Sequence, residues 1–442
     1  MELKEAILSA CNVAPDLVWI DPVLFAEEWQ EKKGLGGCFA GLAEQVLAQR
    51  SRIEKTEEAA EKVAEESIRL ALRNEVLRKE KEKTEKLDMV LRCRKMAFPL
   101  MEWFQENARI LRWRSEPRPY YVWISEIMLQ QTRVEAVKGY FDRFIESLPD
   151  IQALAECPEE KLLKLWEGLG YYNRVRNLQK AARQIIEDYE GKLPDSYEKL
   201  QKLPGIGSYT AGAIASIAYG KPAPAVDGNV LRVLKRLTGS RDDITKPAVK
   251  KEAELLFGAL AKWVEQAGGK PGNLNQALME LGATVCLPNG KPSCENCPVE
   301  SLCRIAGTKE WQEIPVKPAK KSRKIEERTV FVISQGERVG LCKRPEKGLL
   351  AGLWELPNTE RKLSPEEAGQ FLEETLGIEA VELLSLGEAK HIFSHVEWRM
   401  VGYAVKVAEY VKVRSPIRMV TGQELEKEYS LPSAFEAYRP ET

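Results

Sequence analysis

The spacing of hydrophobic positions divides the chain into segments with different predicted structure. Residues 96–303 carry dense amphipathic patterns with short polar breaks, which predict packed helices. From residue 328 onward, apolar and polar positions alternate as they do in strands, for example at 329–333, and a helical pattern covers Pro365 to Leu376. The sequence therefore predicts a helical domain over 96–305 followed by a smaller α/β domain over 328–442.

Residues 1–95 contain apolar positions at three- and four-residue spacing, which predicts a long helix. These positions are Leu42, Val46, Ile53, Ala60, Val63, Leu70 and Leu77, and Glu and Lys crowd the other faces. Two interpretations remain open: a coiled coil or helix that binds a partner protein, and a solvated helix that packs against its own chain. We expect a helical extension whose role the sequence does not identify.

Residues 306–327 have the composition of an exposed linker. Pro315 and Pro318 interrupt the hydrophobic periodicity there. Basic residues accompany the prolines: they are Lys317, Lys320, Lys321, Arg323 and Lys324. The linker is therefore expected to be positively charged and to attract phosphate groups.

Overall charge does not identify a partner, because 66 Lys and Arg residues nearly balance 67 Asp and Glu residues. At 442 residues the chain is long enough for two or three domains. No apolar run reaches the length of a membrane span and no signal-peptide pattern opens the chain, so we expect a cytoplasmic protein without a membrane partner. The odd number of cysteines, nine, indicates thiols in a reducing compartment instead of a disulfide framework.

The stretch Leu-Pro-Gly-Ile-Gly-Ser-Tyr-Thr at 203–210 predicts a tight turn followed by a helix. Gly205 and Gly207 permit unusual backbone angles, and the N–H groups at the start of the following helix can bind an anion such as a phosphate. The same pattern also fits an ordinary connection between two helices.

Two carboxylates stand in contrasting surroundings. Glu126 is the only charge in an apolar helical run from Tyr120 to Leu129, where desolvation would raise its pKa. Asp227 lies in the polar turn Val-Asp-Gly-Asn at 226–229, where it should stay ionised. Carboxyl groups whose surroundings separate their pKa values are typical of acid catalysis paired with cation stabilisation. The alternative for Glu126 is a surface position on the wet face of its helix.

Four cysteines crowd into eighteen positions with the spacing C-x7-C-x2-C-x5-C: they are Cys286, Cys294, Cys297 and Cys303. Four thiolates in one loop suit either a tetrahedral zinc ion or a [4Fe–4S] cluster. A zinc ribbon more often has two C-x2-C pairs, whereas only Cys294 and Cys297 form such a pair here. The spacing therefore favours the iron–sulfur cluster.

A further stretch, Gly-Leu-Gly-Tyr-Tyr-Asn-Arg-Val-Arg at 168–176, combines a flexible turn, two aromatic rings and two cations. These residue types can stack on bases and bind phosphates, although buried tyrosines explain many such pairs.

Together these motifs resemble the adenine DNA glycosylases of the MutY type, in the helix-hairpin-helix glycosylase superfamily. The Glu126 helix, the Gly-Leu-Gly-Tyr-Tyr turn, the hairpin, the Val-Asp-Gly-Asn-Val turn and the four cysteines occur in the family's order, over about residues 98–440. The resemblance implies a mainly α helix-hairpin-helix glycosylase core with an iron–sulfur cluster loop, a smaller C-terminal α/β Nudix-like domain, and an N-terminal helical extension.

The implied function is DNA repair by a monofunctional enzyme. It would flip out and hydrolytically remove adenine mispaired with 8-oxoguanine or guanine in double-stranded DNA. The resemblance further implies a [4Fe–4S] cofactor on the four cysteines, and we expect a monomer that associates with the nucleoid when bound to DNA.

The resemblance also implies site residues. At the matching positions, Glu126 is the acid that protonates adenine N7, Asp227 faces the oxocarbenium-like sugar, and Tyr209 and Asn229 orient groups around the sugar and phosphate. The residues that match contacts to the flipped adenine are Arg114 and Gln276. Those expected to contact DNA are the wedge Gln131 with Thr132, the intercalating Tyr171, and the hairpin glycines Gly205 and Gly207.

Recognition of 8-oxoguanine is expected in the segment Lys-His-Ile-Phe-Ser-His at 390–395, interpreted as a loop before a strand. The resemblance implies a Phe-Ser-His reader here, which comprises Phe393, Ser394 and His395. A hydroxyl can accept from the N7–H of 8-oxoguanine, and a backbone N–H can meet its O8. The alternative is an ordinary surface loop.

Three rival functions remain to be distinguished. Endonuclease III shares the expected fold but uses a lysine amine at the position of Tyr209, and a phenol cannot form a Schiff base. A Nudix domain could hydrolyse 8-oxo-dGTP, but Glu373 and Glu374 lack the usual preceding Arg-Glu pair. A non-catalytic DNA-binding protein would leave both carboxylates without a chemical role.

Two positions depart from the family pattern. The first cysteine spacing has seven intervening residues where six are commoner, and Arg112 stands where the family usually has Pro. The first change lengthens a loop without changing the number of ligands, and the second affects the shape of the loop around Arg114.

Overall fold

The computed structural model describes residues 57–318, 322–409, 413 and 416–440, with side chains described from residue 69 onward except at residue 82. Of the N-terminal apolar positions above, Leu42, Val46 and Ile53 therefore lie outside the described residues. Two compact units have their boundary between Arg94 and Lys95.

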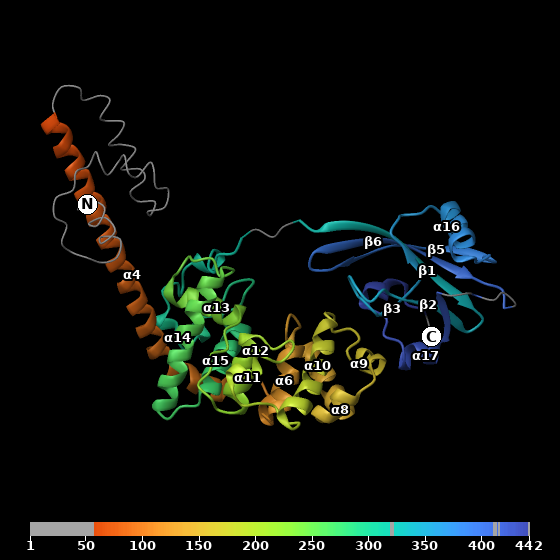
Figure 1. Cartoon of the computed structure of the whole chain (residues 1–442), viewed down its shortest axis with the longest axis horizontal. Helices are drawn as coiled ribbons and strands as arrows, with labels where there is room; N and C mark the ends of the chain where they lie inside the picture. The colour runs from red at the N-terminus through yellow and green to blue at the C-terminus, as the bar shows by residue number, and fades with distance from the viewer. Residues whose placement is uncertain (1–56, 319–321, 410–412, 414–415, 441–442) are drawn as a thin grey trace. The chain divides into compact units, whose positions relative to one another are not determined.

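Helices dominate residues 57–284 (Figure 1). Their bounds are α4 (Glu57–Asn107), α5 (Arg112–Ser115), α6 (Pro119–Met128), α7 (Val134–Ser147), α8 (Ile151–Glu156), α9 (Glu159–Leu165), α10 (Asn173–Tyr189), α11 (Tyr197–Leu200), α12 (Ser208–Ala213), the π-helical turn η1 (Ile214–Ala218), α13 (Gly228–Thr238), α14 (Pro247–Gln266) and α15 (Pro271–Thr284). Short 3₁₀ turns follow: they are η2 (Cys294–Asn296), η3 (Glu300–Leu302) and η4 (Glu310–Gln312).

Helix α4 runs past the expected boundary at residue 95 without a break. Leu70 and Leu77, two of the apolar positions that predicted this helix, are 58% and 52% exposed. The helix itself is therefore present, while the two interpretations of its apolar positions both remain predictions.

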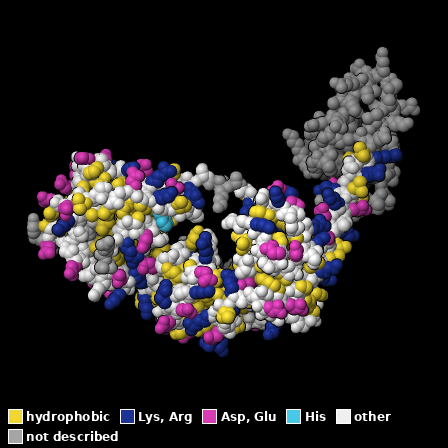
Figure 2. Space-filling model, turned by 180° about the vertical axis from the view of Figure 1, so that it is seen from behind, with side chains coloured by type: hydrophobic (Ala, Val, Ile, Leu, Met, Phe, Trp, Pro, Cys, Tyr) yellow, Lys and Arg dark blue, Asp and Glu magenta, His cyan; other side chains and the backbone are white. Residues whose placement is uncertain are grey.

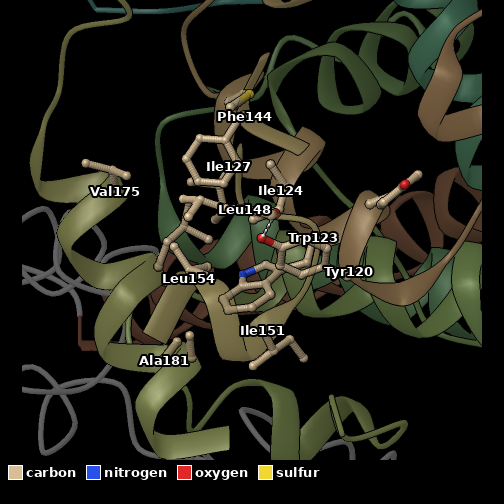
Figure 3. Close-up of a cluster of buried hydrophobic side chains, with 14 of the residues drawn as sticks. Tyr120, Trp123, Ile124, Ile127, Phe144, Leu148, Ile151, Leu154, Val175 and Ala181 are labelled. Carbon is tan, nitrogen blue, oxygen red and sulfur yellow. Dashed lines mark hydrogen bonds between the residues drawn. The ribbon is translucent and has the colours of Figure 1, made fainter. Parts of the chain in front are cut away.

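Helix α6 is the centre of the helical core. Pro119 occupies its first turn, where the fixed φ of proline suits a helix start, and residues Tyr120–Met128 are all buried. Figure 3 shows the side chains around it: Tyr120, Trp123, Ile124 and Ile127 of α6 lie among Phe144, Leu148, Ile151, Leu154, Val175 and Ala181 from neighbouring elements. The Tyr120 hydroxyl also donates to the Leu148 carbonyl at 2.9 Å. Burial of one such large side chain contributes about 1.5–3 kcal/mol, so α6 is held firmly in place.

The C-terminal part is built on one seven-stranded sheet with the order β3-β2-β1-β6-β5, to which β4 adds on β1 and β7 on β2. The strands are β1 (Lys324–Gln335), β2 (Arg338–Lys343), β3 (Trp354–Glu355), β4 (Asn358–Thr359), β5 (Glu382–Ile392), β6 (Val396–Lys406) and β7 (Ile417–Thr421). Strands β1 and β6 pair in parallel, and β5 and β6 pair antiparallel. The helical elements are α16 (Pro365–Phe371), the π-helical turn η5 (Leu372–Leu376), α17 (Gly422–Lys427) and the 3₁₀ turn η6 (Ser433–Tyr438).

Two expected boundaries in this domain were wrong. Strand β1 begins at Lys324 and not at residue 328, because its first residues pair with β6, as in Lys324↔Val396. Residues 390–392 are the end of β5 and not part of a loop, because His391 pairs with Trp398 across the sheet. The expected helix near Pro365 is present, and Ser364 caps it through a reciprocal capping box with Glu367.

Cationic and anionic side chains are interspersed on the face of the molecule shown in Figure 2. This mixture agrees with the formal net charge of −1. Among the residues that the structure describes, no helix has both the length and the apolar character of a membrane span.

Candidate active site

Glu126 is a buried carboxyl on α6. The residue is 6% exposed, and its Oε2 atom has no hydrogen-bond partner within the described part of the chain. Burial raises the pKa of Glu126 to about 7; the Asp227 carboxylate also raises this pKa, while hydrogen bonding to Tyr209 and the charge of Arg114 lower it. Glu126 can therefore hold a proton near neutral pH, and one of its oxygens is buried without a hydrogen-bond partner in the described part of the chain.

Asp227 is the N-cap of α13. Its carboxylate accepts hydrogen bonds from Asn229 N (2.9 Å), Val230 N (2.8 Å) and Asn229 Nδ2 (2.7 Å). Burial raises the pKa of Asp227, which the polar sequence around it did not indicate, and these hydrogen bonds oppose that effect. The start of a helix also favours a negative charge. The two carboxyl groups thus differ in their partners: Asp227 has three donors, and Glu126 Oε2 has none among the described residues.

Arg232, which the sequence analysis missed, supports Asn229 from the next turn of α13. Its Nη2 atom donates to Asn229 Oδ1 at 2.9 Å and to the Gly282 carbonyl at 2.7 Å, and its Nε donates to the Cys286 carbonyl at 2.9 Å. A continuous chain of hydrogen bonds therefore runs from the cysteine loop to Asp227. The sequence could have identified Arg232, because it stands three residues after Asn229 on an amphipathic helix and so lies on the same face.

Tyr209 lies on α12 and belongs to the same cluster. Its hydroxyl donates to Met279 Sδ at 3.5 Å. Burial, together with the nearby Glu126 and Asp227 carboxyls, raises the pKa of Tyr209 well above its ordinary value. The phenol is therefore a neutral hydrogen-bond donor beside the two carboxyl groups.

Arg114 is fixed by an ion-pair network that the sequence analysis did not foresee. Its Nη2 atom lies 2.7 Å from Oε2 of Glu280, a residue with no solvent exposure. Arg109 also binds Glu280, through Nε at 2.7 Å and Nη2 at 2.8 Å. Burial alone would raise the pKa of Glu280, but hydrogen bonds from Arg109 and Arg114 lower it to about 2. Glu280 is thus an ionised anchor for both arginines.

Helix α15 contributes several of these residues from one face. Gln276, Met279 and Glu280 are spaced at i, i+3 and i+4, so they project on the same side of the helix. Since Met279 contacts Tyr209 and Glu280 contacts Arg114, the half-buried Gln276 is on the side of α15 that faces the site.

In the glycine-rich turn before α12, one of the two glycines has the expected unusual backbone angles and the other does not. Gly205 has φ +78°, a conformation that favours glycine, and a Cβ there would come within 2.9 Å of Asn177 Cβ. Gly207 is the N-cap of α12 with an ordinary φ of −87°, so the expectation of unusual angles at both glycines was wrong. No side chain caps this helix start, and the first N–H groups of a helix, which lack intrahelical partners, can bind an anion.

The other expected DNA-contacting residues, Gln131, Thr132 and Tyr171, lie in two strained turns. Gln131, after α6, has φ +59°, and Tyr171, before α10, has φ +48°, although neither is glycine. Both side chains are exposed, Tyr171 by 47%. Thr132 is half-buried, and its hydroxyl donates to the Gln130 carbonyl at 3.4 Å.

The four cysteines line one small pocket of ≈ 30 Å³ together with Arg236. Arg236 Nη1 donates to Cys286 Sγ at 3.4 Å, the type of hydrogen bond that tunes a cluster sulfur. The four thiols on one pocket fit a thiolate-bound metal centre. In the described ranges, however, no group of three or more His, Cys, Asp and Glu side chains is arranged so that it could hold a metal ion.

Phe393, Ser394 and His395 form the turn between β5 and β6. Phe393 N donates to the Val396 carbonyl at 2.8 Å, which closes the turn. The Phe393 ring packs on Trp398 at 4.9 Å between centroids, and Ser394 Oγ lies 3.3 Å from His395 Nδ1. Ser394 and His395 are exposed. These residues therefore belong to the sheet domain, and their contacts above do not join them to the Glu126 cluster.

Comparison with protein families gives two matches in the regions just described. Residues 124–258 match the HhH-GPD superfamily of base excision DNA repair proteins, and residues 329–439 match the NUDIX domain. Among solved structures, a thermostable thymine-DNA glycosylase covers 48% of this chain with 30% identity and a TM-score of 0.42, and 95% of that chain is matched. A non-covalent endonuclease III–DNA complex matches with 27% identity and a TM-score of 0.40, over 48% of this chain and 95% of that one.

Curated relatives identify the family more narrowly than these matches do. The adenine DNA glycosylase of Mus musculus is 37% identical over 355 residues, which are 67% of this chain and 68% of that protein. The adenine DNA glycosylase of Schizosaccharomyces pombe is 33% identical over 368 residues, with coverage of 67% and 78%. The expectation drawn from the motifs is confirmed: the chain belongs to the adenine DNA glycosylases, hydrolases of base excision repair that remove adenine from DNA.

Proposed function

We propose that the substrate is adenine mispaired with 8-oxoguanine or guanine, and that Glu126 and Asp227 divide the chemistry of its release. The observation that carries this assignment is the buried, unpartnered Glu126 Oε2 beside the hydrogen-bonded Asp227. Adenine is a poor leaving group, so its N7 needs a proton, and the sugar develops positive charge as the bond breaks. These two needs call for one protonated and one ionised carboxyl group.

In this mechanism Glu126 delivers the proton to N7 of the flipped adenine. Its raised pKa supports the protonated form near pH 7, and its Oε2 atom has no hydrogen-bond partner among the described residues. Asp227 then faces the oxocarbenium-like sugar, where its negative charge stabilises the transition state. Tyr209 and Asn229 hold the surroundings of both groups in place, and Arg114 and Gln276 contact the base.

Hydrolysis without strand cleavage is expected because Tyr209 stands where a lyase needs an amine. A phenol with a strongly raised pKa stays protonated and forms no Schiff base with the sugar. Water therefore completes the reaction and leaves an intact abasic strand. The duplex is held by the turn at Gly205 and Gly207, and Gln131, Thr132 and Tyr171 occupy the space that the flipped nucleotide leaves.

The four cysteines are proposed to hold a [4Fe–4S] cluster. Its thiolate bonds would cross-link the loop after α15, from Cys286 to Cys303, and so give this irregular segment a fixed shape. Cys286 is also the residue whose carbonyl oxygen binds Arg232, so a fixed loop supports the position of Asn229.

The Nudix-like domain is proposed to recognise the base opposite adenine. Ser394 and His395 are exposed at the β5–β6 turn, where a hydroxyl and backbone N–H groups can meet N7–H and O8 of 8-oxoguanine. The packing of Phe393 on Trp398 holds the base of this turn in place.

A panel of labelled duplexes tests the proposal: 8-oxoguanine:A, G:A, T:A and 8-oxoguanine:C, each followed by alkali to cut abasic sites. Cleavage of the adenine strand in the first two duplexes, and only after alkali, is expected. Equal activity on T:A would contradict the mispair assignment, and cleavage without alkali would contradict a monofunctional reaction.

A further inference from the structure

Arg174, the second residue of α10, binds the backbone of two separate turns. Its Nη1 atom donates to three carbonyls at the end of α6, those of Ile127 (2.8 Å), Met128 (3.0 Å) and Gln130 (2.7 Å). Its Nη2 atom donates to two carbonyls in the turn before α10, those of Leu169 (2.9 Å) and Gly170 (3.1 Å). One guanidinium group therefore joins segments that lie about forty residues apart in the sequence, as the Gln130 contact shows.

Each of these turns places an unusual residue directly after a carbonyl that Arg174 binds. Gln131 follows Gln130 with φ +59°, and Tyr171 follows Gly170 with φ +48°. The left-handed conformation costs an L-residue roughly 1–2 kcal/mol, so the surrounding structure must hold it. Among described residues other than glycine, positive φ occurs at two further positions only, Glu190 and Leu350.

The charge of Arg174 is balanced by backbone and aromatic groups. The carbonyls at the end of α6 carry the negative end of the helix dipole, which attracts a cation. The guanidinium also lies 5.3 Å from the Trp166 ring centroid and 5.5 Å from that of Tyr171. Trp166 Nε1 also donates to the Gly170 carbonyl at 3.0 Å, so this carbonyl before Tyr171 has two side-chain donors, Arg174 and Trp166.

We propose that Arg174 is a positioning residue that holds Gln131 and Tyr171 together in the conformation from which both insert into DNA. The inference rests on the DNA-inserting roles proposed above for these two side chains. Only arginine has donors on two nitrogens in a fixed fork that can bind both sets of carbonyls; a lysine ammonium has three donors at a single point. Arg174 therefore acts on base extrusion through the two turns and touches no reacting atom.

The test uses Arg174→Met and Arg174→Lys in the full-length protein, with Arg183→Met as the control. Arg183 lies on the same helix and donates through Nε to a single carbonyl, that of Ala155, at 3.1 Å. The readouts are single-turnover adenine release from an 8-oxoguanine:A duplex, and the fluorescence of 2-aminopurine placed next to the target adenine, which reports extrusion of the base. Thermal unfolding is measured for each variant.

We expect Arg174→Met to slow both extrusion and release roughly 10- to 100-fold, in the range found for coupled neighbouring residues. Arg174→Lys should give an intermediate loss, and Arg183→Met should behave as the unchanged protein. Should Arg174→Met lower the yield of folded protein, Arg174→Lys carries the comparison, because it keeps the charge and part of the carbonyl contacts.

The same substitution in a Gln131→Ala/Tyr171→Ala background separates positioning from a general structural role. If Arg174 acts through these two side chains, its loss causes little further slowing there. Additive slowing, or unchanged extrusion in Arg174→Met, would overturn the inference. If the Gln131→Ala/Tyr171→Ala variant itself extrudes adenine normally, the proposed DNA-inserting roles fail instead, so the two failures are distinguishable.

Discussion

The side-chain amide of Asn229 donates a hydrogen bond to Asp227 Oδ2 at 2.7 Å. Asp227 keeps two backbone donors without it, from Asn229 N and Val230 N, so the carboxylate would stay at the start of α13. A hydrogen bond to an ionised group contributes about 1.5–3 kcal/mol. Asn229→Ala is therefore expected to slow single-turnover adenine release roughly 10- to 100-fold with little change in duplex affinity. Release at the unchanged rate would show that the amide does not support Asp227.

The raised pKa of Glu126 makes a separate prediction about stability. Its pKa is about 7 in the folded protein and near the ordinary 4.5 in the unfolded chain. The folded state binds this proton more tightly, so ionisation of Glu126 lowers the free energy of unfolding as pH rises from about 4.5 to 7. Glu126→Gln cannot ionise. It should be more stable than the unchanged protein at pH 8, by on the order of 3 kcal/mol, and this advantage should shrink towards pH 5.

Urea unfolding at pH 5 and pH 8 measures this difference, with Glu102→Gln, an exposed glutamate on α4, as the matched control. The control should show no comparable gain. A Glu126→Gln variant that is less stable than the unchanged protein at pH 8 would show that the carboxyl is held in its charged form.

The proposed cluster predicts the metal content. Protein purified without oxidation should be yellow-brown and contain about four iron and about four acid-labile sulfide per chain, the composition of a cubane. Removal of the metal should unfold the loop from Cys286 to Cys303 and withdraw support from Arg232, so adenine release should fall with iron content. Stoichiometric zinc without iron would favour the alternative metal, a tetrahedral zinc ion on the same four cysteines.

The β5–β6 turn predicts a change in preference between mispairs. Ser394→Ala combined with His395→Ala should reduce the preference for 8-oxoguanine:A over G:A by about 1–3 kcal/mol, the scale of one base-specific contact. Release from G:A should change much less, because the chemistry belongs to the helical domain. Ser385→Ala, on β5 of the same sheet, is the matched control. Equal losses on both duplexes would mean that the turn supports general binding only.

Local patterns predicted the elements that carry the two carboxyl groups. The apolar run Tyr120–Leu129 is α6, displaced by one residue, because a continuous apolar sequence of that length needs a helix buried on all sides. The turn at Asp227 was predicted to be polar, and it is a helix start with three donors. A buried helix and a polar turn are both predictable because each is specified by residues that are adjacent in the sequence.

Contacts between distant residues could not be predicted in the same way. Arg109 and Glu280 are separated by 171 positions, and nothing in the local sequence of either indicates the other. The left-handed backbone at Gln131 also has no local signal, because the carbonyl before it is bound by Arg174, 44 positions further along the chain. The end of β5 was misassigned for a related reason: residues 390–392 are extended because they pair with β6.

Whether Glu126 is the acid for adenine release is tested by single-turnover release with Glu126→Gln on an 8-oxoguanine:A duplex between pH 6 and 9. In the unchanged protein the rate should fall about tenfold per pH unit above about pH 7, as the carboxyl loses its proton. Glu126→Gln should bind the duplex normally, release adenine about 10²–10⁴-fold more slowly, and lose this pH dependence. Release by Glu126→Gln at the unchanged rate, with the same pH profile, would show that Glu126 is not the acid.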